Sequence, residues 1–120
     1  MTMLAQAVVA LVALLHLYFL VLEMFLWTKP AGRRAFGTTP EFAESSKVLA
    51  ANQGLYNGFL AAGLLWGLSL GGTGRAIVTF FLWCVVIAGV YGAITANRKI
   101  LFVQAVPALL GLVLTYLAHA

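Results

Sequence analysis

The chain has 120 residues, of which 63% are hydrophobic and 8% are charged, and its formal net charge is +4. A soluble domain of this length needs many more charged side chains to cover its surface. The chain also lacks the basic surface domain that nucleic-acid binding requires, so nucleic acid is excluded as a partner. The composition therefore predicts an integral membrane protein whose main partner is the lipid bilayer.

Four apolar blocks follow one another, and each is long enough to cross a hydrocarbon core, which takes about 20 residues. The blocks predict an all-α, single-domain membrane bundle with four helices, at about residues 3–27, 40–70, 76–96 and 100–119. The first block has no basic segment before it, and Glu23 and Trp27 stand where a signal peptide would have a small-residue cleavage site. We therefore expect a retained first helix.

The segment between the first two helices, residues 28–39, is expected to be a cytoplasmic loop. The run Lys29-Pro30-Ala31-Gly32 breaks the first helix. Thr39 followed by Pro40 has the pattern of an N-cap with proline at the first helical position. The second helix is therefore expected to begin near Pro40.

The distribution of basic residues predicts the orientation of the helices. One basic residue, Arg75, falls in the second loop. Six fall on the opposite side, in the segment Thr28–Lys47 or in the third loop: Lys29, Arg33, Arg34, Lys47, Arg98 and Lys99. The positive-inside rule places these two loops in the cytoplasm and both termini outside. Most of the positive charge is thus a signal of topology.

Glycines recur at a spacing of four residues, as in Gly54 with Gly58, and Gly63 with Gly67 and Gly71. Such ridges of small residues let helices approach closely in lipid. They fit packing within the four-helix bundle, or an interface between subunits. Because four short helices enclose little volume, we expect a homo-oligomer.

Glu23 is the only acidic residue within a long apolar run. A carboxylate in a membrane span is costly and usually faces protein or a water-filled cavity. With the orientation above, all four helices place polar side chains at a similar depth in the cytoplasmic half. Helical spacing collects them on faces and predicts a cytoplasm-facing polar pocket for a small or amphipathic molecule. Its candidate ligand-binding residues are His16, Glu23, Asn52, Gln53, Tyr56, Asn57, Tyr91 and Gln104.

Glu23 is the key charge of this site, and Asn52, Tyr56 or Gln104 could supply its hydrogen-bond donors. The alternative is a purely structural network, in which each polar side chain contributes about 0.6 kcal/mol. His16 lies two turns deeper, about 10 Å along the helix axis. It either shares a proton path with Glu23 or is a core histidine. The few histidines and cysteines predict no metal site, and no motif identifies a cofactor.

The segment His16–Trp27, together with Ala51–Ala61, resembles a bacterial family of small four-helix membrane proteins that is catalogued as a domain of unknown function. The resemblance spans essentially the whole chain. It implies the four-helix topology and the bacterial cytoplasmic (inner) membrane, but no activity.

Two weaker resemblances keep other functions open. The architecture is similar to that of the membrane-associated eicosanoid and glutathione enzymes, and Asn52 would match the asparagine of their Arg-Ala-x-x-Asn-x-x-Glu motif, whereas Leu55 replaces its glutamate. This likeness implies a membrane-bound transferase-like enzyme. A single glutamate in the first helix also resembles the small multidrug exporters, which implies a proton-coupled transporter that uses Glu23.

Overall fold

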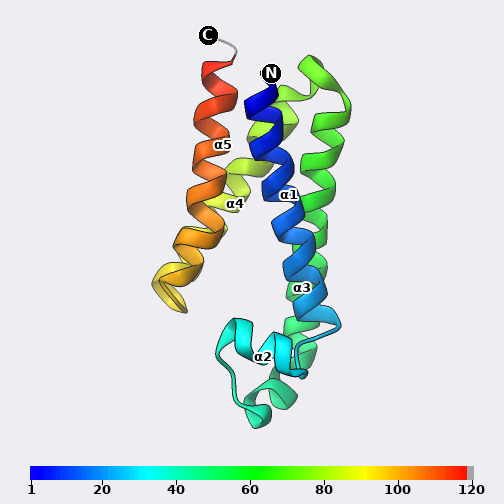
Figure 1. Ribbon diagram of the computed structural model, residues 1–120, viewed down its shortest axis with the longest axis vertical. Coiled ribbons are helices and arrows are strands. Elements are labelled where there is room, and N and C mark those ends of the chain that lie inside the picture. Colours follow the sequence, from blue (N-terminus) through cyan, green and yellow to red (C-terminus); the bar gives the residue numbers. More distant parts are fainter. Residues whose placement is uncertain (119–120) are drawn as a thin grey trace. The chain divides into compact units, whose positions relative to one another are not determined.

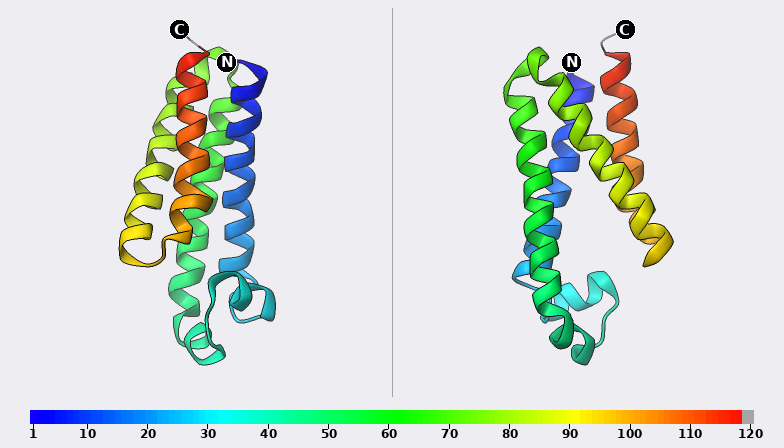
Figure 2. Two further views of the ribbon diagram at one scale, coloured as in Figure 1. Left: turned by 60° about the vertical axis from the view of Figure 1, so that its left-hand side comes forward. Right: turned by 180° about the vertical axis from the view of Figure 1, so that it is seen from behind.

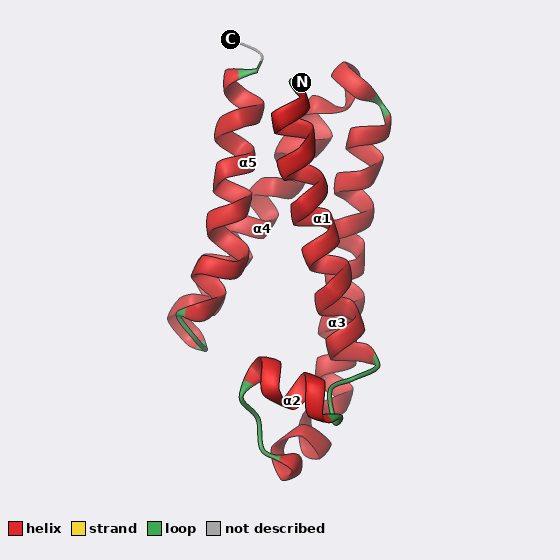
Figure 3. Cartoon of the chain, viewed as in Figure 1, coloured by secondary structure: helices red, strands yellow, loops and turns green. Residues whose placement is uncertain are grey.

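The computed structural model describes residues 1–118, and Figure 3 shows that they form helices joined by short loops. The elements are α1 (Met3–Met24), α2 (Pro30–Phe36), α3 (Pro40–Ser69), the 3-10 turn η1 (Gly71–Gly74), α4 (Arg75–Thr95), the π-helical turn η2 (Leu101–Ala105) and α5 (Val106–Leu117). The described part of the chain is therefore all-helical, with five α-helices and no strand. Residue 119, where the last predicted helix was expected to end, lies outside the described residues.

Two helical segments are long and apolar enough to cross a membrane, namely α1 and Gly71–Thr95, which contains α4. The core helix of a soluble protein would be mostly buried. In the most apolar 18-residue stretch of each span, however, only 33% of α1 and 22% of Gly71–Thr95 are buried within the chain. Large apolar side chains such as Phe80 and Ile87 are more than half exposed. The structure thus offers two candidate membrane spans, and the four-helix membrane bundle stays a prediction.

The chain divides into two compact units, each of which contains part of α1 and part of α3. One unit is Leu15–Phe59, which we call the hairpin unit. The other is Met1–Leu14 with Leu60–Ala120, which we call the α4–α5 unit. The two units are described separately below.

In the hairpin unit, the end of α1 and the beginning of α3 run antiparallel (Figure 1). Glycines on α3 make the contact close. A Cβ atom on Gly54 would lie 2.7 Å from the Cγ atom of Met24 and 3.1 Å from the Cβ atom of Glu23, and one on Gly58 would meet Leu20. The absence of a side chain at Gly54 therefore allows α3 to pack directly on the last two turns of α1.

α2 lies within the segment that was expected to be a loop. It begins at Pro30, because proline suits the first helical position, and it ends before Gly37, which is left-handed with φ of 66°. Trp27, which precedes α2 in the chain, contacts both α3 and α2. Its indole Nε1 donates to Ser46 Oγ at 3.0 Å, and its ring centroid lies 5.0 Å from that of Phe36.

α1 ends at Met24, three residues before the predicted end. The backbone N–H groups of Phe25 and Leu26 both donate to the carbonyl oxygen of Val21, at 3.0 and 3.2 Å. The shared acceptor gives both N–H groups a hydrogen-bond partner where the helix ends and the turn toward α2 begins. Trp27 therefore lies in the connection and not in the helix.

In the α4–α5 unit, α4 and α5 form an antiparallel hairpin, and both views in Figure 2 show them side by side. Gly89 makes the contact close, because a Cβ atom there would lie 2.8 Å from the Cβ atom of Ala105. The turn η2 precedes Pro107 and replaces the first turns of the single kinked helix that was expected. Proline has no N–H group to donate, so a change of helical register just before it is physically reasonable.

Two glycines of the predicted ridge, Gly63 and Gly67, pack inside this unit. Gly63 faces Phe81, and Gly67 faces Val78 and Gly74, all of them on η1 or α4. These glycines therefore serve contacts within the chain, and homo-oligomerisation stays a prediction.

Thr115 on α5 is 1% exposed, and its Oγ1 atom has no hydrogen-bond partner among the described residues. A buried hydroxyl without a partner costs about 1–3 kcal/mol. We expect Thr115→Val, which keeps the shape of the side chain, to raise the free energy of unfolding by about 1 kcal/mol. Unfolding by sodium dodecyl sulfate in mixed micelles would measure the change. Thr95→Val, at an exposed threonine whose hydroxyl bonds to the Tyr91 carbonyl oxygen, is the control and should give no gain.

Candidate functional site

Glu23 and Asn57 are the two predicted site residues that the structure joins. Glu23 lies in the last turn of α1 and is 3% exposed, and Asn57 lies on α3 and is 8% exposed. The side-chain Nδ2 atom of Asn57 donates to Oε1 of Glu23 at 2.5 Å. A buried carboxylate is thus held by a neutral amide from the facing helix.

Asn52, Tyr56 and Gln104 were the donors considered for Glu23, and the structure adds Asn57, which none of these expectations named. The physical reason is the rotation of α3. Gly54 marks the face of α3 that touches α1, and at about 100° per residue Asn57 lies about 60° from this face. Asn52 and Tyr56 are each two residues from Gly54, so they lie about 160° away from the contact.

The other predicted residues of the hairpin unit lie in two kinds of surroundings. Asn52, Gln53 and Tyr56 are exposed on α3. His16 is fully buried on α1, with its ring edge-on to Phe19 at a centroid distance of 5.3 Å. His16 and Glu23 are seven residues apart, which places them near one face of α1, two turns from each other.

Tyr91 and Gln104 belong to the α4–α5 unit. Tyr91 is 69% exposed near the end of α4, and Gln104 is partly buried in η2. The convergence of polar faces from all four predicted helices into one pocket stays a prediction.

No ion pair with a basic side chain is found for Glu23 among the described residues. Among the described residues, the salt bridge that the structure records joins Lys47 to Glu44, both on the exposed surface of α3, and Glu23 takes part in none. A carboxylate can only accept hydrogen bonds, and it offers about four lone-pair positions. Asn57 fills one of these positions without neutralising the charge. The arrangement can therefore accept a proton or a cationic group.

A metal centre is a separate question, because two or three carboxylates, histidines or cysteines would have to cluster. In residues 1–118, no group of three or more such side chains is placed to hold a metal ion. Glu23 and Asn57 contribute one carboxylate and one amide.

Gly54 and Gly58 are the positions of this site that reasoning from polar side chains did not include. They bring Leu20, Met24 and the Cβ atom of Glu23 close against α3. Their four-residue spacing was the signal, but it indicates close packing without naming the facing helix.

The profile of a family described as "Protein of unknown function (DUF1304)" matches residues 10–116. A relative from Lactococcus lactis subsp. lactis (strain IL1403), described as "Uncharacterized protein YpaA", is 33% identical over 118 residues, which are 97% of this chain and 99% of the relative. No solved structure matches the chain. These matches confirm the resemblance to a family of unknown function with a bacterial member, whereas the resemblances to enzymes and exporters stay predictions.

Proposed function

The chain belongs to the DUF1304 family, and we propose that it is an integral protein of the bacterial cytoplasmic membrane that binds a small amphipathic cation at Glu23 and Asn57. One observation carries the proposal. A carboxylate that is 3% exposed, in the last turn of a candidate membrane span, has a neutral amide as its recorded partner. An acidic side chain in this position is a typical element of a substrate or ion site.

The membrane location is supported by the apolar surface of α1 and α4. The basic residues support an orientation in which α2 and the start of α3 face the cytoplasm. Glu23 then lies near the cytoplasmic end of α1. A ligand would therefore reach it from the cytoplasm or from the inner leaflet.

The class of ligand follows from the charge and from the neighbours of the carboxylate. Burying a carboxylate without a counter-charge is costly, and a ligand cation would supply the missing charge. The apolar side chains of Leu20 and Met24 lie near Glu23 on α1, against Gly58 and Gly54. A cation with an apolar body fits both features.

The test is a binding measurement with a defined lipophilic cation. We expect the purified chain in mild detergent to bind tetraphenylphosphonium, and Glu23→Gln to weaken this binding roughly tenfold or more. Glutamine keeps the size and the hydrogen-bonding ability of the side chain and removes its charge. Equilibrium dialysis with radiolabelled tetraphenylphosphonium would give both dissociation constants.

The matched control is Glu41→Gln, at an exposed glutamate in the first turn of α3 in the same unit. This variant should bind like the unchanged chain. Equal affinity in the unchanged chain and in Glu23→Gln would overturn the proposal, and so would an equal loss in both glutamine variants.

A further inference from the structure

α4 and α5 border an open groove of about 340 Å³ that is separate from the Glu23 site and lies entirely within the α4–α5 unit. Its α4 wall is formed by Arg75, Thr79 and Trp83, whose spacing of four residues places them on one face. Its α5 wall runs from Leu109 to Leu117 and is apolar except for Tyr116. The groove is therefore long, apolar and bordered by one cationic side chain.

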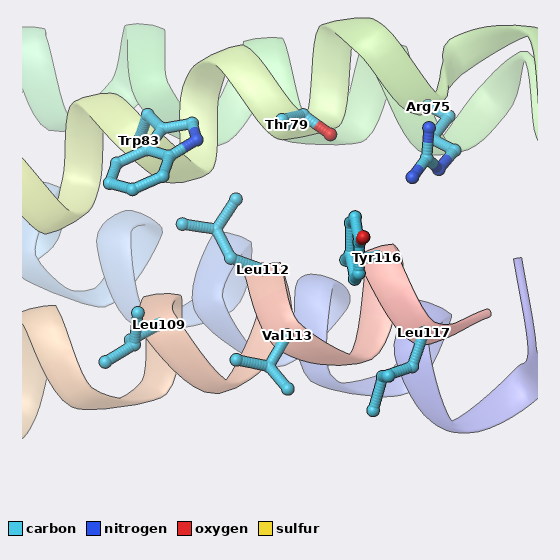
Figure 4. Close-up of a pocket in the computed structure, with 8 residues that line it drawn as sticks. All are labelled: Arg75, Thr79, Trp83, Leu109, Leu112, Val113, Tyr116 and Leu117. Atoms are coloured by element: carbon cyan, nitrogen blue, oxygen red, sulfur yellow. The ribbon is translucent and has the colours of Figure 1, made fainter. Parts of the chain in front are cut away.

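The cationic side chain and the Tyr116 phenol lie at the same end of the groove (Figure 4). Figure 4 shows Arg75 and Tyr116 on opposite walls at this end, and Trp83 and Leu109 at the other end. The Nε atom of Arg75 donates to the backbone oxygen of Thr115 at 3.4 Å, which ties the guanidinium to α5. A molecule in the groove would meet a cation and a phenol at one end and apolar side chains beyond them.

Arg75 has no carboxylate side chain to pair with in its own unit. The three acidic residues of the chain are Glu23, Glu41 and Glu44, and all of them belong to the hairpin unit. Guanidinium groups bind phosphate through paired, charge-assisted hydrogen bonds. The groove thus combines a phosphate-binding group with an apolar channel.

We propose that the groove holds one acyl chain of an anionic phospholipid from the surrounding bilayer, with the lipid phosphate at Arg75. Charge complementarity selects this occupant, because a zwitterionic lipid carries its own cation beside the phosphate and gains less from a second one. The inference rests on the proposed membrane location and is independent of the ligand at Glu23. By the predicted orientation, this lipid belongs to the outer leaflet.

Trp83 lies in the groove and is half exposed, so its fluorescence can report the occupant. The chain would be placed in vesicles of phosphatidylcholine and phosphatidylglycerol, with bromine on the acyl chains of one lipid at a time. Bromine quenches tryptophan at contact, and the difference between the chain and Trp83→Phe isolates the quenching of Trp83. We expect Trp83 to prefer phosphatidylglycerol about fivefold over its mole fraction.

Arg75→Gln should reduce this preference to that of random contact. Arg98→Gln, at an exposed arginine beyond the end of α4 in the same unit, should retain it. No preference in the unchanged chain, or a preference that survives Arg75→Gln, would overturn the lipid site. Preferential quenching by brominated oleate, without preference for phosphatidylglycerol, would overturn it in favour of a free fatty acid. Absence of quenching by either brominated phospholipid would overturn the membrane location itself. This outcome distinguishes a wrong membrane location from a wrong lipid site.

Discussion

Gly74→Ala is expected to lower the free energy of unfolding by about 3 kcal/mol, which is a large effect for the addition of one methyl group. Gly74 lies where η1 meets α4, and its Cα atom packs against the backbone of Gly67 on α3. A Cβ atom there would overlap the carbonyl oxygen of Gly67 and lie 2.7 Å from its carbonyl carbon. Backbone atoms cannot rotate away as a flexible side chain can, so α3 and α4 would have to separate.

The control is two residues away. Gly72 lies in the same turn, without a positive φ, and a Cβ atom on it would meet nothing within 4 Å. Gly72→Ala should therefore change the free energy of unfolding by less than about 0.5 kcal/mol. Denaturation of both variants in mixed micelles, followed by circular dichroism, would compare them. Equal stability of the two variants would show that η1 does not pack against Gly67 as described.

Asn57→Ala is expected to lower the free energy of unfolding by about 2–3 kcal/mol, because it removes the recorded hydrogen-bond donor to a buried carboxylate. Gln53→Ala removes an exposed amide from the same helix and should cost less than about 0.5 kcal/mol. The same micelle titration would measure both variants.

A double-mutant cycle separates the pair from other effects of the substitution. If Asn57 acts through Glu23, then Asn57→Ala should cost little once Glu23→Ala is present, and the coupling energy should exceed about 1 kcal/mol. Additive losses would contradict the Glu23–Asn57 pairing. The single variant also bears on function, because a less stable Asn57→Ala chain that still binds tetraphenylphosphonium normally would assign Asn57 a structural role.

The all-helical class could be predicted from apolar blocks alone, because such blocks leave the backbone few other ways to satisfy its hydrogen bonds in an apolar environment. α2 could not. The same proline and glycine that indicated a break, Pro30 and Gly32, are compatible with the start of a short helix. A helix of seven residues is not stable by itself and needs tertiary contacts, here the packing of Trp27 on Phe36. The local sequence does not indicate that Trp27 and Phe36 are in contact.

The importance of Glu23 could be predicted because a lone carboxylate in an apolar run has few explanations. Its partner could not, because the choice between Asn52, Tyr56 and Asn57 depends on how α3 is rotated against α1. α1 packs closely against Gly54, where no side chain stands in the way. This contact, and not the polar side chains, fixes the rotation of α3. The close packing at Gly54 thus decides which polar residue of α3 lies near Glu23.

The separation of Glu23 from Asn57 along the chain has a consequence for biosynthesis. Asn57 is synthesised 34 residues after Glu23, so the hydrogen bond cannot form while α1 is the only helix that has been made. In a membrane, the nascent first helix would carry an unaccompanied acidic group, and retention beside the insertion machinery until the third helix arrives would lower that cost. In that case the hydrogen bond would couple the release of α1 into lipid to the synthesis of α3.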